Sequence, residues 1–246
     1  MKKILIVGGT GATGKLLMEQ FLDRGMGVRV IVRSVDRIPE AIRNHENLDV
    51  VRANLLELSD EEMAEYVSDC GAVASCLGHT LSWKGIYGQP RRLVADAVRR
   101  LCSAINTNDP EEPTKFVLMN TTGNSNRDLN EKISFAQKSV MVLLRLLLPP
   151  HVDNEEAADF LRLKIGKTAK GIQWVAVRPD GLTDEDSVSG YELHASPTRS
   201  AIFDAGKTSR INVAHFMADL VTDEEAWGEW SGKMPVIYNL REAQEQ

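Results

Sequence analysis

The chain has 246 residues, which is long enough for a large core, and 43% of them are hydrophobic and 26% charged, as in an ordinary soluble globular protein. Its formal net charge of −6 and pI near 5.5 give no reason to expect nucleic acid or an acidic membrane surface as a partner. Its three cysteines form no Cys-x-x-Cys pair, so we expect buried thiols in a reducing cytoplasm and no metal site.

The amino terminus does not predict a secretory leader. Met1 to Lys3 resemble the basic start of a signal peptide, but the apolar run that follows has four residues and ends in glycines. The most apolar window, residues 140–148, contains Arg145 and is far shorter than a membrane span. We therefore expect a cytoplasmic protein with no membrane partner.

The chain opens with a predicted strand, a glycine-rich turn and a helix. Residues 4–7 are apolar and mostly β-branched, and residues 8–14 read Gly-Gly-Thr-Gly-Ala-Thr-Gly. The apolar residues that follow fall on one helix face: Leu16, Leu17, Phe21 and Leu22. This order of strand, turn and helix distinguishes a dinucleotide-binding turn from a chance spacing of glycines.

Each glycine of the turn has an expected role. Gly8 lets the chain leave the strand sharply, Gly11 leaves room for a pyrophosphate, and Gly14 lets the helix pack close to the sheet. The N–H groups and the helix dipole at residues 12–14 favour a diphosphate. The spacing differs from Gly-x-Gly-x-x-Gly, and the residue after Lys15 is not the Ser or Thr of an ATP-binding loop. The alternative is a tight turn that binds nothing, but the context favours phosphate.

The second predicted strand, residues 28–32, ends in Arg33 and Ser34. An NAD-binding site would hold an acidic residue there for the ribose 2′-hydroxyl, whereas a guanidinium suits a 2′-phosphate. Arg37 follows four residues later. The alternative is a solvated surface arginine paired with Asp36. The sequence therefore favours NADP(H) over NAD(H).

Strands and helices alternate along the rest of the chain. Further strands are expected at residues 48–51, 72–77, 116–119, 174–177 and 234–238. One helix is expected to start at the capping box of Ser59 and Glu62, and others are expected at residues 89–106, 213–221 and 224–230. A long helical region before residue 149 is expected to break at residues 149–150 and to restart at Asp153. Residues 80–88 predict a loop.

This alternation predicts an α/β fold: a single Rossmann-type, doubly wound parallel sheet of about seven strands, with helices on both faces and one domain over residues 1–246. The polar, turn-rich segment 182–209 makes residues 179–215 the expected substrate-side cap. Residues 140–148 predict a helix against the sheet rather than a subunit contact. Ligands of such folds bind at the carboxyl ends of the strands, where the polar clusters of this sequence lie.

These motifs resemble the short-chain dehydrogenase/reductase superfamily in its atypical, NmrA-like branch, and within it the small flavin and biliverdin-type reductases. The likeness is strongest before residue 80 and from 160 to 182, where Trp-Val-Ala-Val-Arg-Pro at 174–179 is similar to the signature of strand six. The resemblance implies an NADP(H) site. Its cofactor-binding residues would be Gly8, Thr10, Gly11, Ala12, Thr13 and Gly14 in the turn, Arg33 and Ser34, Asn54 and Leu55 near the adenine, Cys76, Leu77 and Gly78 past the ribose, and Thr121 and Pro179.

One feature of the superfamily is missing. Its catalytic Tyr-x-x-x-Lys does not occur on the helix after the fifth strand, where alignment puts Pro150 at the tyrosine and Asn154 at the lysine. Because no lysine lowers a tyrosine pKa, ordinary alcohol–ketone chemistry is not expected. Thr121, near the family's serine position, and His151 are the candidate catalytic residues, although a histidine after two prolines is more often a surface residue.

The leading hypothesis is an NADP(H)-dependent oxidoreductase that transfers hydride to a small conjugated acceptor, such as a flavin, quinone or tetrapyrrole. Water can supply the proton, and Trp83 and Tyr87 would stack on the acceptor or else pack in a loop. The alternative is a non-catalytic NADP(H) sensor of the NmrA type that acts on a protein partner. An isomerase or epimerase ranks last because it also needs the missing acid–base pair.

Overall fold

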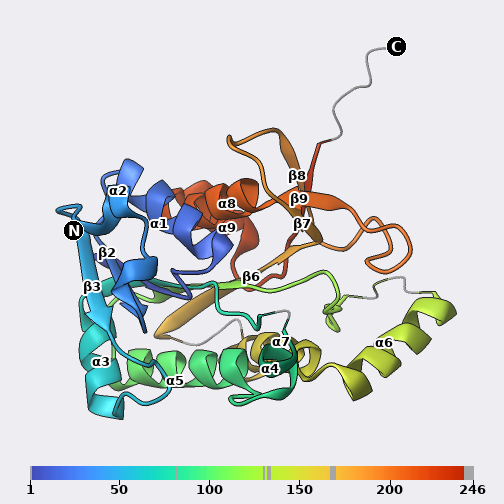
Figure 1. Cartoon of the computed structure of the whole chain (residues 1–246), viewed down its shortest axis with the longest axis horizontal. Helices are drawn as coiled ribbons and strands as arrows, with labels where there is room; N and C mark the ends of the chain where they lie inside the picture. Colours follow the sequence, from blue (N-terminus) through green and yellow to red (C-terminus); the bar gives the residue numbers. More distant parts are fainter. Residues whose placement is uncertain (1, 81, 130, 132–133, 167–169, 241–246) are drawn as a thin grey trace.

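An eight-stranded sheet forms the centre of the molecule, in the order β3-β2-β1-β4-β5-β6-β10-β8 (Figure 1). The computed structural model describes residues 2–80, 82–129, 131, 134–166 and 170–240. Neighbouring strands of this sheet are parallel except β8, which is antiparallel to β10. The strands are β1 Lys3–Val7, β2 Val28–Val32, β3 Leu48–Arg52, β4 Cys70–Ser75, β5 Thr114–Met119, β6 Ile172–Pro179, β8 Tyr191–His194 and β10 Val236–Asn239, and a separate parallel pair joins β7 Gly181–Thr183 to β9 Lys207–Ser209.

Helices cover both faces of this sheet (Figure 1). Helices α1, α2, α8 and α9 lie on one face and α3, α4, α5 and α7 on the other, while α6 extends away at one end of the molecule. The helices are α1 Ala12–Asp23, α2 Glu40–Arg43, α3 Asp60–Ser68, α4 Trp83–Tyr87, α5 Leu93–Thr107, α6 Phe135–Leu147, α7 Pro149–Phe160, α8 Arg210–Thr222 and α9 Glu224–Trp230, with a 3-10 turn η1 at Val35–Arg37 and a π turn η2 at Leu161–Ile165. Within the described chain, no helix combines the length and apolarity needed to cross a bilayer.

Alternation along the central strands builds two hydrophobic cores. In β1, Ile4 and Ile6 belong to the core under α1 and α8, whereas Leu5 and Val7 belong to the core under α3 and α5. All four residues are at most 1% exposed. A strand buried on both faces must be apolar without interruption, which is why residues 4–7 show no polar alternation.

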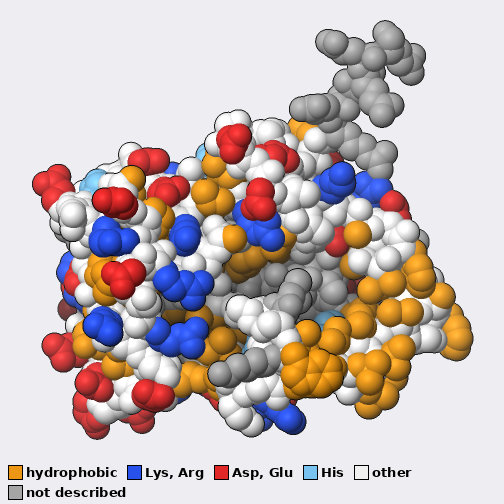
Figure 2. Space-filling model, in the orientation of Figure 1, with side chains coloured by type: hydrophobic (Ala, Val, Ile, Leu, Met, Phe, Trp, Pro, Cys, Tyr) orange, Lys and Arg blue, Asp and Glu red, His pale blue; other side chains and the backbone are white. Residues whose placement is uncertain are grey.

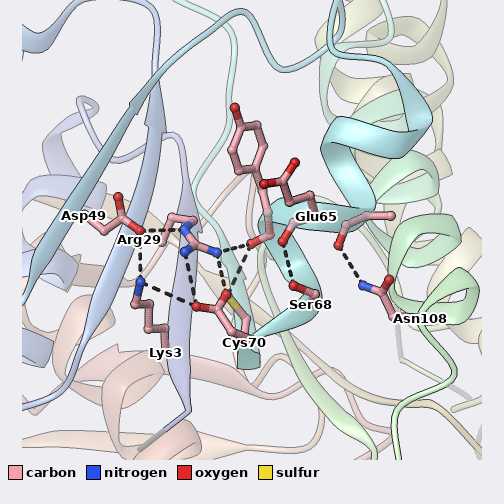
Figure 3. Close-up of polar contacts among 10 residues, drawn as sticks. Lys3, Arg29, Asp49, Glu65, Ser68, Cys70 and Asn108 are labelled. Atoms are coloured by element: carbon pink, nitrogen blue, oxygen red, sulfur yellow. Dashed lines mark hydrogen bonds and ion pairs between the residues drawn. The ribbon is translucent and has the colours of Figure 1, made fainter.

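An ion-pair network joins the amino-terminal halves of β1, β2 and β3 (Figure 3). Arg29 Nε donates to Asp49 Oδ2 at 2.8 Å, and its Nη1 donates to Asp69 Oδ1 at 2.5 Å. Lys3 Nζ donates to Asp49 at 3.0 Å. Burial acts to raise the pKa of Asp49 and Asp69, but the hydrogen bonds from Arg29 and Lys3 outweigh burial and lower both pKa values. The network therefore stabilises the sheet away from the carboxyl ends of its strands.

The predicted fold class is confirmed, and the differences from the prediction are local. The main sheet has eight strands instead of about seven because β8, from the segment expected to be irregular, pairs with β10. Residues 83–87 form a short helix where a loop was expected. Helix α7 begins at Pro149 and not at Asp153, because a proline in the first turn sacrifices no intrahelical hydrogen bond.

The expectation that residues 140–148 pack against the sheet is wrong. They are helical up to Leu147, but Met141 is the one buried residue of α6. Leu146 is 77% exposed, and Leu143 and Leu147 are each 53% exposed. Helix α6 therefore does not pack against the sheet.

Candidate functional site

The glycine-rich turn is folded so tightly that two of its positions admit no side chain. Gly8 has φ +79°, and a Cβ there would lie 2.5 Å from the carbonyl carbon of Cys76. A Cβ on Gly14 would lie 2.2 Å from the Gly8 carbonyl oxygen, which also accepts a hydrogen bond from Gly11 N at 3.0 Å. This close approach of backbone to backbone is the reason for glycine at both positions.

The first turn of α1 lies at the rim of this loop. Gly11 is the N-cap, and no side chain caps the helix. Gly11 and Ala12 are exposed, while Thr13 and Gly14 are buried. Because the first N–H groups of a helix have no partner within it, they and the helix dipole favour an anion at this point. A dinucleotide pyrophosphate fits this cradle.

A cleft of about 460 Å³ lies beside the turn, at the carboxyl ends of β1, β2, β3 and β4. This is the point where the strand order reverses, and the volume is that of a small-molecule site. Six of the expected cofactor-binding residues line the cleft: Gly8, Thr10, Arg33, Asn54, Leu55 and Leu77. Ser34 follows Arg33 as the N-cap of η1.

Arg33 is an exposed side chain that faces this cleft. Within the part of the chain that the structure describes, it makes no hydrogen bond or ion pair, and Asp36 does not pair with it. The guanidinium is therefore available to a ligand. Arg37 is also exposed but does not line the cleft.

Sequence reasoning missed several residues of the cleft. Gln89 and Pro90, just before α5, and Leu93, its first residue, also line the cleft, and no local signal in the sequence marks them. Glu57 also lines the cleft and accepts a hydrogen bond from Asn54 Nδ2 at 2.7 Å. Its position three residues after Asn54 could have indicated this contact.

The remaining expected cofactor-binding residues lie outside this cleft. Cys76 N donates to Val7 O at 2.9 Å and so extends the pairing of β1 with β4, and Gly78 follows it. Burial raises the pKa of the Cys76 thiol to about 12, so it stays protonated. Thr121 and Pro179 lie after β5 and at the end of β6, further along the same edge of the sheet.

Helix α7 holds the two positions of the missing Tyr–Lys pair. Asn154 Nδ2 donates to Pro150 O at 3.0 Å, so both positions lie on one face of the helix. Asn120, after β5, donates through its Nδ2 to Asn154 O at 2.9 Å and accepts from Thr121 N. Neutral amide groups thus hold the helix next to the end of β5, and Pro150 and Asn154 provide no phenol or ammonium group.

The two candidate catalytic residues both lie close to Gly123. A Cβ on that glycine would be 3.5 Å from Thr121 Oγ1 and 3.7 Å from His151 Cε1. The His151 side chain is 10% exposed, so the expectation of a surface residue is wrong. Its Nε2 lies 3.5 Å from Glu155 Oε1, one turn further along α7.

Glu155 lies beside this histidine and is itself held in place. Arg145 Nε and Nη2 each donate to its carboxylate at 2.8 Å. Burial acts to raise the pKa of Glu155, but the contacts with His151 and Arg145 outweigh it and bring the pKa to about 2. A permanent carboxylate therefore stands behind the imidazole.

A second histidine fastens the loop after β4. His79 Nε2 lies 2.7 Å from Asp153 Oδ2, and its Nδ1 lies 3.0 Å from Gly85 O. The same buried carboxylate accepts from the backbone N–H groups of Val94 and Ala95 at 2.8 Å each and so caps α5. The hydrogen bond with Asp153 raises the pKa of His79 against the effect of burial.

A second pocket, of about 590 Å³, lies between the start of α6 and residues 197–204. Its lining is mostly hydroxyl, amide and charged groups: Thr122, Ser125, Glu131, Ser134, Gln137, Thr198, Arg199, Ser200 and Asp204, with Pro197 and Phe203. Trp83 and Tyr87 line neither pocket. Among the described residues, no three His, Cys, Asp or Glu side chains gather as ligands for a metal.

The buried Arg178 of β6 fixes one wall of this second pocket. Its Nη2 donates to Glu131 Oε1 at 2.8 Å and to Ala195 O at 3.2 Å. Its Nε donates to Met234 O, and its Nη1 donates to Asn124 O. The side chain is 0% exposed, so a single cation joins the loop after β5 to the segment before residue 197.

Comparison with known proteins places these features in a family context. Residues 8–224 match a protein family described as NAD(P)H-binding. An uncharacterized chloroplastic protein of Arabidopsis thaliana is 25% identical over 225 residues, which are 92% of this chain and 74% of that protein.

Solved structures share the fold at low sequence identity. An oxidoreductase of Lactococcus lactis has a TM-score of 0.69 and 18% identity, over 97% of this chain and 91% of that chain. A candidate NADH-flavin reductase of Streptococcus pneumoniae has a TM-score of 0.63 and 17% identity, over 98% and 100%. A short-chain dehydrogenase/reductase of Veillonella parvula in complex with NADP has a TM-score of 0.66 and 18% identity, over 97% and 95%.

Proposed function

The chain belongs to the NAD(P)H-binding family, and on this premise we propose that it is an NADP(H)-dependent reductase of a small conjugated acceptor, of the flavin, quinone or tetrapyrrole type. The observation that carries the proposal is a dinucleotide cleft beside a helix that has Pro150 and Asn154 in place of the Tyr–Lys pair. A conjugated acceptor spreads the added charge over several heteroatoms, so it does not require a strong acid at one oxygen. The bound cofactor would supply the hydride.

The preference for NADP(H) is supported by Arg33. The residue ends β2, lines the cleft and makes no ion pair within the described residues. A guanidinium offers a 2′-phosphate both charge and a pair of parallel N–H donors. The glycine turn and the start of α1 would hold the diphosphate, and Asn54 and Leu55 would line the adenine end.

The acceptor would bind in the second pocket, under a cap formed by residues 179–215. This assignment is supported by Thr198, Arg199 and Ser200, which line the pocket from the cap, and by Thr122, which lines it from the loop after β5. The nicotinamide end of a dinucleotide that starts at the turn would extend toward Thr121 and Pro179, which lie on the same edge of the sheet. The protein would then act by positioning donor and acceptor.

His151 or Thr121 would assist proton transfer to the reduced acceptor. Both side chains lie next to Gly123, and the Glu155 carboxylate faces the His151 imidazole. The carboxylate would help to hold the His151 ring in place beside the acceptor. Water could replace this donor at a lower rate.

The experiment is a screen of flavins, quinones and linear tetrapyrroles for acceptor-dependent oxidation of NADPH, followed by absorbance. We expect turnover with one class, and we expect His151→Gln to lower kcat by about tenfold or more while the Kd of NADPH stays unchanged. Leu163→Gln, at an exposed residue of η2, serves as the control for handling and folding.

The second candidate function is a non-catalytic NADP(H) sensor that regulates a protein partner. It is favoured by Pro150 and the neutral amide of Asn154 at the two positions where the superfamily has its acid–base pair. Tight NADPH binding without oxidation by any acceptor in the screen would support the sensor and reject the reductase.

A further inference from the structure

Helix α6 presents an apolar face to solvent. Its exposed apolar residues are Phe135 (86%), Val142 (53%), Leu143 (53%), Leu146 (77%) and Leu147 (53%). At 3.6 residues per turn these five positions fall within an arc of about 140°, and the buried Met141 lies on the opposite side. Figure 2 shows hydrophobic side chains gathered over α6, at the end of the molecule where this helix extends outward.

Helix α4 is joined to the end of this surface. Tyr87 Oη donates to Leu147 O at 3.0 Å, and the ring of Trp83 lies 4.6 Å from the ring of Tyr87. Trp83 is 81% exposed. We call Trp83 and the five exposed residues of α6 the apolar face. It contains the indole, phenyl and leucine side chains that are typical of helices lying at a membrane interface.

The charges beside the apolar face are basic. Neither α4 nor α6 contains an acidic residue, although the chain has a formal net charge of −6. Lys138 and Arg145, seven residues apart, flank the same edge of the 140° arc. Arg145 pairs with Glu155, whereas Lys138 makes no ion pair among the described residues. Two copies of the chain docked through this face would each bring Lys138 to the contact, and neither α4 nor α6 offers an acidic residue to pair with it, so the charges disfavour self-association.

We propose that the apolar face docks the protein onto an anionic phospholipid surface, with α6 lying in the plane of that surface. The six apolar side chains would enter the boundary between headgroups and acyl chains, and Lys138 would lie among the phosphates. This inference does not rest on the reductase assignment. It differs from the expectation drawn from the overall net charge because that number averages over the chain and hides the local charge of α6.

The first test is flotation of the full-length protein with vesicles of phosphatidylcholine alone and with vesicles that also contain phosphatidylglycerol. We expect binding to the phosphatidylglycerol vesicles, weaker at higher salt. The double substitution Phe135→Glu/Leu146→Glu should weaken binding by about tenfold or more, because two large apolar groups leave the interface. Leu163→Glu, whose side chain is 62% exposed on η2, should bind as the wild type does.

The second test uses tryptophan emission and does not depend on whether the double glutamate variant folds. Of the four tryptophans, Trp174, Trp227 and Trp230 are at most 6% exposed, so Trp83 dominates any response to lipid. We expect brominated lipid in the phosphatidylglycerol vesicles to quench the wild type and to leave the Trp83→Phe variant unquenched. Absence of both flotation and quenching would overturn the proposal, as would equal binding to both vesicles. A dimer in solution that the double substitution dissociates, with no vesicle binding, would also overturn it and assign the face to a second copy.

Discussion

Arg33→Ala tests the cofactor preference most directly. Of the described residues that line the cleft, Arg33 carries the one positive charge. Replacing it with alanine removes the contact proposed for the 2′-phosphate of NADPH and leaves the glycine turn unchanged. NADH has no phosphate at this position, so it provides an internal comparison.

The size of the effect follows from the exposure of the side chain. A hydrogen bond to a charged group contributes about 1.5–3 kcal/mol. Arg33 is exposed, so solvent and salt screen the contact, and we expect the lower end of that range. About 1.5 kcal/mol corresponds to roughly a tenfold increase in the Kd of NADPH. The Kd of NADH should change by less than about twofold.

The assay is a fluorescence titration of both cofactors at low and moderate salt. The matched control is Arg37→Ala, because Arg37 is exposed and only four residues away but does not line the cleft. The affinity of the wild type for NADPH should fall with salt more steeply than that of Arg33→Ala. Equal losses of affinity for NADPH and NADH would refute the 2′-phosphate role.

Three further predictions concern other parts of the structure. Gly11→Val should abolish binding of both cofactors in the same titration, because the new side chain occupies the pyrophosphate position; retained affinity would mean that the turn is only structural. His79 has a pKa raised above its ordinary value of 6.5, so its contribution to the free energy of unfolding is complete below that pH and is lost as pH rises through the folded-state pKa. Denaturant titrations should show this loss in the wild type and not in His79→Gln. Arg29→Met should lower the unfolding free energy by about 1–3 kcal/mol at neutral pH. The loss should be smaller at acidic pH, because protonated Asp49 and Asp69 no longer form ion pairs with Arg29 in the wild type. An equal loss at both pH values would contradict the network.

Local chemistry made the amino-terminal half predictable. The strand at residues 4–7 and the glycine turn are specified by adjacent residues, and the capping box of Ser59 with Glu62 forms as expected. The prediction of an NAD(P)H-binding chain is confirmed by the family match over residues 8–224. Signals of this kind depend on few neighbours, so tertiary structure does not override them.

Features that depend on distant contacts were not predictable. The pattern of residues 140–148 gives a helix but cannot say which surface its apolar side faces, and here that surface is solvent. Pro90 lines the cleft together with Gly8 of the turn, although the two residues lie far apart in the chain. The burial of His151 likewise depends on the loop around Gly123, more than twenty residues earlier in the chain.

The buried guanidinium of Arg178 has a consequence for molecules that enter the second pocket. It restrains the Glu131 side of that pocket and the backbone at Ala195. A bound molecule would therefore have few rotamers to immobilise on this wall, and the wall would add little to the entropic penalty of binding. On this side of the pocket, the shape and hydrogen-bonding pattern of a preorganised wall would select the bound molecule.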